Sequence, residues 1–184
     1  MASYRNGLLT VVALLSVVLL ACGGSGDGGG GGSPMAPSPG IVFTASGGTA
    51  SDAIELRQQG AGGNVLVLEV RAVDVSDLYG LAFDLEFPTN LLRFDGFNDG
   101  GWLSAQGAVS TELLVTEVGD SVVVGLSRLG NVAGRNGSGL LMTLEFTGTS
   151  SGSGSLSFGN DSGFDSDGFE IGLTFSGGSV RVTL

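Results

Sequence analysis

The side chains that could carry out chemistry in this chain are almost all carboxylates. The 184 residues include 18 Asp and Glu, a single Cys and no His, and all seven basic residues are Arg. Without His, Lys or a second Cys, the chain lacks the usual general bases, Schiff-base amines and paired thiols. Two carboxylates across a cleft could hydrolyse a glycosidic bond, and Asp84/Glu86 or Asp165/Asp167 have a suitable spacing on paper. Carboxylates on strand faces and in turns usually contact only solvent, so the sequence predicts a protein that is not an enzyme.

The second candidate for chemistry is an oxygen-rich segment, residues 160–168. It contains Asp161, Asp165 and Asp167, and carboxylates are the hard ligands that Ca²⁺ prefers. An EF-hand loop that starts at Asp161 would need a Glu where this chain has Gly172, and a helix on each side. Asp-Gly is also a common hairpin turn. The sequence therefore favours a turn and predicts no metal or other cofactor, with the three aspartates as the alternative Ca²⁺ ligands.

The single cysteine, Cys22, ends an apolar run that begins at Leu8. A positive charge precedes the run, which is too short to span a bilayer core of about 30 Å comfortably. Its end, Leu19-Leu20-Ala21-Cys22, resembles a bacterial lipoprotein signal. The resemblance implies that residues 1–21 are removed and that Cys22 becomes the lipidated first residue. The alternative is an ordinary secretory signal with an incidental Cys.

Lipidation would attach the protein to a membrane through acyl chains, each CH₂ of which contributes about 0.8 kcal/mol when buried. Gly23 follows the Cys, where an Asp would resemble a signal for retention in the inner membrane. We therefore expect an exported protein on the outer membrane or cell surface. Residues 22–40 hold the lipidated Cys and a Gly-, Ser- and Pro-rich linker without apolar periodicity. Such a linker is a flexible tether, on the order of 23 Å long on average.

The charge of the chain limits its partners. The formal net charge is −11, whereas binding to nucleic acid or to anionic lipid headgroups requires clusters of basic residues. The sequence therefore predicts no nucleic-acid partner. An acidic surface fits a solvated extracellular protein and would also suit a basic or Ca²⁺-loaded partner.

Residues 41–184 are expected to form one domain, because their apolar residues recur with the period of a β-strand. In the segments 64–73 and 78–87, for example, apolar and polar side chains alternate. Turns rich in Gly, Asp and Asn separate such segments. Short strands at this spacing predict an all-β fold, a two-layer β-sandwich or jelly roll. The expected strands are 41–45, 53–58, 64–73, 78–87, 91–97, 111–118, 121–129, 139–147, 154–159, 169–175 and 179–184.

Several of these segments resemble the cohesin domain family. Residues 78–94 look like a strand of that family that leads into a turn and the next strand, and residues 122–127 and 137–146 look like its middle strands. Residues 164–182 are similar to its closing hairpin and final strand. The pieces occur in the family's order over about residues 52–184. The resemblance implies a nine-stranded jelly roll that binds dockerin modules and so tethers polysaccharide-degrading enzymes to scaffolds or cell surfaces.

The resemblance also implies where a partner would bind. In the family, polar residues on the strand that matches 78–87 contact the dockerin. The outward positions here begin with Gly and Ala, which offer no side-chain hydrogen bonds, and continue with Asp84 and Glu86. The next strand of that face would add Leu126 and Arg128, an apolar and a cationic contact, although the facing of this strand is ambiguous.

Two other functions stay open at this point. Related jelly rolls serve as carbohydrate-binding modules, and the fold alone does not choose between such roles. Stacking on polysaccharide requires exposed aromatic rings, for which Tyr79 and Trp102 are the candidates, although Trp102 could instead cap the end of the sandwich. The third function is a structural subunit of an envelope assembly that pairs through its edge strands. The sequence favours a surface lipoprotein that binds a protein partner of the dockerin type.

Overall fold

The structure is a computed structural model that describes residues 39–47, 50–60 and 62–184. The regular elements of these residues are all β-strands, and no helix among them is long and apolar enough to cross a membrane. The expected signal peptide at 1–21, Cys22 and the linker up to residue 38 lie outside the described residues. The all-β class expected for the domain is confirmed.

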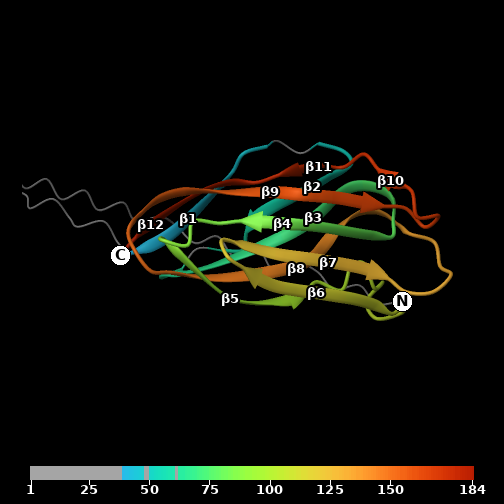
Figure 1. The fold of residues 1–184 in the computed structure, drawn as a ribbon, viewed down its shortest axis with the longest axis horizontal. Helices are drawn as coiled ribbons and strands as arrows, with labels where there is room; N and C mark the ends of the chain where they lie inside the picture. Colours follow the sequence, from blue (N-terminus) through green and yellow to red (C-terminus); the bar gives the residue numbers. More distant parts are fainter. Residues whose placement is uncertain (1–38, 48–49, 61) are drawn as a thin grey trace, which may run out of the picture. The chain divides into compact units, whose positions relative to one another are not determined.

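The strands form two sheets (Figure 1). The first contains, in spatial order, β1 (Gly40–Ala45), β12 (Gly178–Thr183), β9 (Gly152–Phe164), β4 (Gly80–Glu86), β7 (Ser121–Arg128) and β6 (Thr111–Val118), with β10 (Glu170–Ile171) paired to β9. The second contains β11 (Thr174–Ser176), β2 (Ala53–Gln58), β3 (Val65–Leu78), β8 (Arg135–Gly148) and β5 (Leu92–Asp99). Neighbouring strands are antiparallel except β11 and β2, which are parallel.

One hydrophobic core lies between the two sheets. Its residues come from alternate positions of the strands, such as Leu81, Phe83 and Leu85 on β4 and Leu66 and Leu68 on β3. All five are at most 3% exposed, and each buried side chain of this size contributes about 1.5–3 kcal/mol. The period-two pattern of the sequence therefore corresponds to one buried and one outer face of each sheet, which confirms the two-layer sandwich.

Each expected strand range contains a strand, and the structure differs mainly in where strands continue or break. β3 runs on to Leu78 through two irregularities in its pairing with β8. Asp74 and Asp77 stand at these points with φ of +49° and +51°, a left-handed conformation that Asp tolerates better than most residues. Ser138 Oγ and Asn136 Oδ1 accept their backbone N–H groups, both at 2.8 Å. The expected strand 169–175 is two strands, β10 and β11, which pair in different sheets.

The two sheets are joined at one side by a glutamine. The edge strand β1 has β12 on one side, and on its other side the Phe43 N–H donates to Gln58 Oε1 at 2.8 Å. Gln58 Nε2 in turn donates to the Ile41 carbonyl at 3.1 Å. One side-chain amide at the end of β2 thus satisfies the donor and the acceptor that a neighbouring strand would otherwise use.

Candidate functional site

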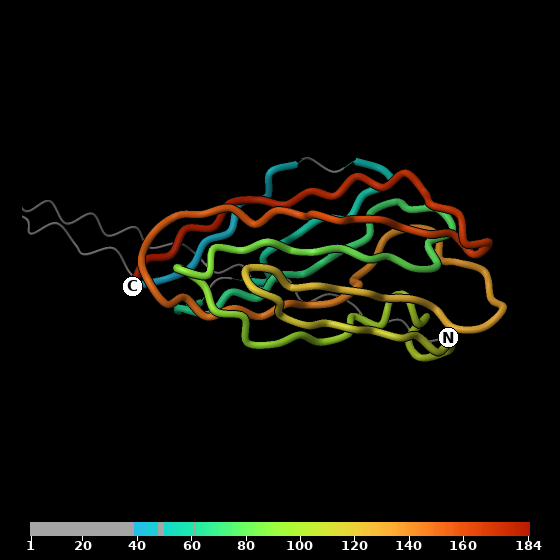
Figure 2. Tube along the Cα trace, viewed as in Figure 1, coloured from blue at the N-terminus to red at the C-terminus, as the bar shows by residue number. Residues whose placement is uncertain are grey.

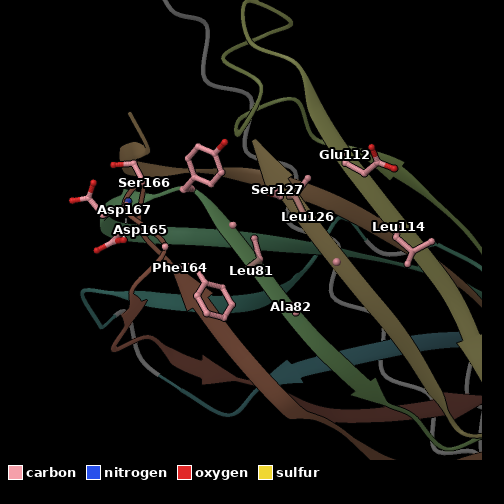
Figure 3. A pocket seen from close by; sticks show the side chains of 14 residues that line it. Leu81, Ala82, Glu112, Leu114, Leu126, Ser127, Phe164, Asp165, Ser166 and Asp167 are labelled. Atoms are coloured by element: carbon pink, nitrogen blue, oxygen red, sulfur yellow. Dashed lines mark hydrogen bonds between the residues drawn. The ribbon is translucent and has the colours of Figure 1, made fainter. Parts of the chain in front are cut away.

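An open groove of about 590 Å³ lies on the outer face of the first sheet (Figure 3). Its floor consists of small residues at outward positions of the paired strands β4 and β7: Gly80 opposite Ser127, and Ala82 opposite Gly125. The inward residues between them are large and buried. The hollow therefore arises because two adjacent strands present almost no side-chain volume on their outer face.

Gly125 keeps the middle of the floor open without a packing reason. A Cβ atom added at Gly125 would meet no atom within 4 Å, and its φ is not in the left-handed region. Gly100, by contrast, would place a Cβ 2.4 Å from the Leu140 carbonyl oxygen. Glycine in a strand costs stability, so neither packing nor backbone conformation explains the glycine at this position.

The sides of the groove are apolar and acidic. Figure 3 shows Leu114 of β6 on one side of the floor and Phe164 of β9 on the other. Leu114 is 61% exposed. Glu112 of β6, Tyr79 and the turn that contains Asp165 and Asp167 also line the groove, and the lining contains no Lys or Arg. The groove thus offers an apolar interior with a negatively charged rim.

The turn at the end of the groove is held by its own carboxylate. Asp165 Oδ1 accepts the backbone N–H groups of Asp167 at 3.0 Å and Phe169 at 2.8 Å, and Gly168 adopts a φ of +84°. The hairpin turn that the sequence favoured is therefore present. Asp161 lies earlier, within β9, and no group of three or more His, Cys, Asp or Glu in the described ranges is arranged to hold a metal ion.

Asp77, at the end of β3, fastens this turn to the rest of the domain. Its carboxylate accepts the Ser166 Oγ–H at 2.8 Å, the Ser166 N–H at 3.3 Å and the Gly134 N–H at 2.8 Å. The hydrogen bond from the Ser166 side chain, opposed in part by desolvation, is the main reason that the pKa of Asp77 lies below its usual value. Three separate segments meet at one ionised carboxylate, so this end of the groove is held in place by contacts within the domain.

The predicted contacts Asp84 and Glu86 occupy outward positions of β4, as expected. They continue the outer face beyond the groove and interact with the neighbouring strand β9. Asp84 Oδ2 accepts a hydrogen bond from Asn160 Nδ2 at 2.6 Å, and Glu86 Oε2 accepts one from Ser157 Oγ at 3.3 Å. Both carboxylates are therefore oriented by β9 and add negative charge to the same face.

The predicted outward contacts Leu126 and Arg128 are wrong, because β7 turns these residues into the sandwich. Leu126 is 2% exposed and Arg128 is 5% exposed, and the Arg128 guanidinium donates to the Leu103 carbonyl. The outward residues of β7 at the groove are instead Gly125 and Ser127. The Val-Val-Val-Gly-Leu run of this strand is apolar in both alternations, so its sequence did not reveal the inner set.

Trp102 caps the end of the sandwich and is not available for stacking on a glycan. It is 8% exposed, its ring occupies the space beside Gly139, where a Cβ would lie 1.9 Å from Cδ1, and the Arg135 guanidinium carbon lies 5.0 Å from its ring centroid. Tyr79 lines the groove, half-buried, and its hydroxyl donates to the Gly130 carbonyl at 2.7 Å. Of the two predicted stacking rings, only Tyr79 is at the surface.

Sequence reasoning missed the β6 side of the groove, Glu112 and Leu114. Thr111–Val118 contains apolar residues in both alternations, and Leu113 and Val115 are the ones that pack against the core. A short strand with apolar residues on both faces is a signal that one set is exposed and available for contact. The sequence of β6 therefore indicated an exposed apolar surface, but it did not indicate that this surface borders a groove.

Comparison with known proteins shows which solved structures share this fold. No protein-family model and no curated protein matches the chain. Among solved structures, a non-cellulosomal cohesin from the hyperthermophilic archaeon Archaeoglobus fulgidus matches with a TM-score of 0.55 and 18% identity over 78% of this chain and 91% of that one. A type II cohesin domain from the cellulosome of Acetivibrio cellulolyticus matches with a TM-score of 0.54 and 12% identity over 79% and 95%. CaCohA2 from Clostridium acetobutylicum matches with a TM-score of 0.57 and 16% identity over 74% and 96%. The domain therefore has the cohesin fold, as the order of its strand and turn segments indicated.

Proposed function

We propose that this chain is a non-catalytic surface lipoprotein whose domain holds a protein partner against the outer face of β9, β4, β7 and β6. The observation that carries the proposal is the groove on that face, with its floor of small residues and its apolar sides, in a domain of cohesin fold. Solved structures of similar fold include an Acetivibrio cellulolyticus cohesin in complex with Cel5 dockerin and a type II cohesin–X-dockerin complex. A dockerin-type module is therefore the class of partner to test.

The chemistry of the groove describes the partner's contact surface. Glu112, Asp165 and Asp167 surround an apolar floor and are not neutralised by any Lys or Arg of the lining. A complementary partner presents Lys or Arg side chains at the rim and one large apolar side chain over the floor, because opposite charges steer association and apolar burial supplies affinity. Asp84 and Glu86 would accept hydrogen bonds from the same partner further along the face.

The small floor residues also distinguish this groove from a strand that binds its partner through polar side chains. Gly80 and Ala82 supply no side-chain hydrogen bonds, so the partner must provide the bulk that fills the hollow. Specificity here would come from shape at the floor and from charge at the rim. A dockerin that requires hydrogen bonds from polar side chains at these two positions would not find them here.

The N-terminal residues would determine where in the cell this function is carried out. A lipidated Cys22 followed by a flexible linker would hold the domain at the cell surface while it reaches for a secreted protein. Replacement by Cys22→Ser should release the protein from membranes or leave the uncleaved precursor. A variant that is still processed and membrane-bound would contradict the lipoprotein assignment.

The binding face is tested by capture from the secreted and envelope proteins of the host. The bait is the full chain with Cys22→Ser, with and without EDTA, because dockerin repeats resemble paired Ca²⁺ loops. Ala82→Arg places a long cation on the groove floor, and Thr143→Arg places the same side chain on the outer face of the second sheet.

We expect a dockerin-bearing protein to be captured in the absence of EDTA, to be lost with Ala82→Arg and to be kept with Thr143→Arg. Equal capture by both variants would remove the groove from the binding site. Retention on polysaccharide resin alone would replace protein binding by glycan binding.

A further inference from the structure

The strand β6 ends the first sheet with an open, regular edge. It pairs with β7 through a two-residue loop, Gly119-Asp120, with Val118 opposite Ser121, and no other described strand pairs with its far side. In such a hairpin the residues beside the loop exchange hydrogen bonds, and every second residue along the strand does the same. The bond from the Leu129 N–H to the Ser110 carbonyl, 2.9 Å, continues this alternation.

The alternation decides which backbone groups are free to bind another chain. Four residues of β6 bond to β7, and the other four direct their N–H and C=O groups to the open side. The second set consists of Thr111, Leu113, Val115 and Glu117. No side chain or loop of the described residues bonds to these groups.

The other long edges of the sandwich are protected, which makes β6 exceptional among the described strands. Gln58 closes the edge of β1. β5 is interrupted by a register shift at Gly96 and carries the Arg93–Asp95 ion pair, and bulges and charges are common protections of a sheet edge. β11 contains only three residues. β6 has no bulge, Pro, Lys, Arg or ion pair, although it carries the carboxylates of Glu112 and Glu117, and it exposes Leu114 and Val118 by 61% and 59%.

The sequence of β6 is complementary to itself in one antiparallel register. With Leu114 opposite Leu114 of a second copy, the free backbone groups meet as Thr111 with Glu117 and Leu113 with Val115, which gives about eight hydrogen bonds across the pair of strands. On the outer face, Glu112 then lies opposite a Thr116 hydroxyl that can donate to it. No carboxylate lies directly opposite another, which would be destabilising.

We propose that this chain forms a two-fold symmetric dimer in which two β6 strands pair antiparallel about Leu114 and join the two first sheets into one. A closed two-fold contact uses the same surface on both copies, as this register requires. Because Leu114 also lines the groove, the second copy would extend the β6 side of each groove with its own Leu114 and Thr116. The two grooves would then lie on one continuous face and could hold two partners side by side.

The dimer is tested by disulfide trapping in the full chain with Cys22→Ser. In a non-hydrogen-bonded antiparallel pair the Cα atoms are about 4.5 Å apart, within the range that a disulfide spans. Leu114→Cys should therefore give a dimer on a non-reducing gel. The matched control, Thr116→Cys, lies on the same face of the same strand, but its symmetry mate is displaced by roughly 13 Å along the strand, and it should stay monomeric. Equal cross-linking of the two variants, or none at Leu114→Cys, would overturn the register.

Sedimentation gives a readout that needs no cross-link. The chain with Cys22→Ser should sediment at about twice 18.3 kDa, and Leu114→Lys, which places two ammonium groups face to face, should shift it to the monomer with unchanged circular dichroism. Association should strengthen with salt, because each copy carries a net charge of −11 and salt screens their repulsion. A single-chain mass at all salt concentrations would refute the dimer. Binding of a basic extended peptide that weakens with salt would assign the edge to another occupant.

Discussion

Filling the groove floor should stabilise the domain and weaken partner binding at the same time. The perturbation is Gly125→Val, at an outward position of β7 where an added Cβ meets no atom within 4 Å. The side chain would lie between Ala82 of β4 and Leu114 of β6, its cross-strand neighbours. The substitution therefore adds volume only to the space that the proposed partner occupies.

The stability change follows from two terms of the same sign. Removing a glycine from a strand interior is worth roughly 0.5–1 kcal/mol relative to Ala. A new apolar pair with the exposed Leu114 adds about 0.2–1 kcal/mol. A gain near 1 kcal/mol corresponds to a Tm increase of about 2–4 °C for a domain of this size. Forcing extra methyl groups into a filled interface costs about 1–3 kcal/mol, which is a loss of about 5- to 150-fold in partner affinity.

The assay pairs a thermal melt by circular dichroism with a titration against the captured partner. Thr143→Val, on the outer face of the second sheet, adds a Val at a comparable strand position and should leave affinity unchanged. A lower Tm for Gly125→Val would show that glycine is required by the fold. A higher Tm with undiminished affinity would show that the partner does not enter the groove, and either result would refute the reasoning.

Three further substitutions test the supports of the domain. Gln58→Ala should destabilise it by about 1–3 kcal/mol, because a donor and an acceptor of β1 lose their partner, and hydrogen exchange at the Phe43 amide should accelerate. Asp77→Asn should cost stability at neutral pH, and because the folded pKa of Asp77 lies below 3.8, the difference from the native protein should shrink as the pH falls below about 4 and be constant between pH 5 and 8. Gly139→Ala would place a Cβ 1.9 Å from the Trp102 ring, so we expect a loss of about 1–3 kcal/mol and a red shift of the tryptophan emission.

The sequence predicted strands and their orientation best where one face of the strand is exposed to solvent. In β4 the alternation of Leu81, Phe83 and Leu85 with Gly, Ala and Asp predicted both the strand and its outward side, and the structure agrees. In β7 apolar residues occupy both alternations, and the wrong facing of Leu126 and Arg128 followed. Period alone cannot orient a strand whose two faces are both apolar.

Long-range features had no local sequence signal. The side-chain amide of Gln58 closes an edge that lies in the other sheet, and the Asp77 carboxylate joins turns that are 57 and 89 residues away. The groove likewise depends on Gly80 and Gly125 standing on adjacent strands. Each of these requires the pairing of strands that are distant in the chain, so only the assembled sheets reveal them.

The position of β1 has a mechanical consequence for a domain that is held from its N-terminal side. Gly40 pairs with Thr183, next to the C-terminus, and β12 in turn pairs with the start of β9 (Figure 2). The groove lies at the other end of β9, beside Phe164. A load between the linker and a bound partner would therefore run along the strands. The six residue pairs between β1 and β12, supported by the Gln58 amide, would resist this load in shear, so their hydrogen bonds would have to break together. A load across the strands would instead break the hydrogen bonds one pair at a time. The same linkage that closes a sheet edge would thus let the domain act as a rigid coupling under flow.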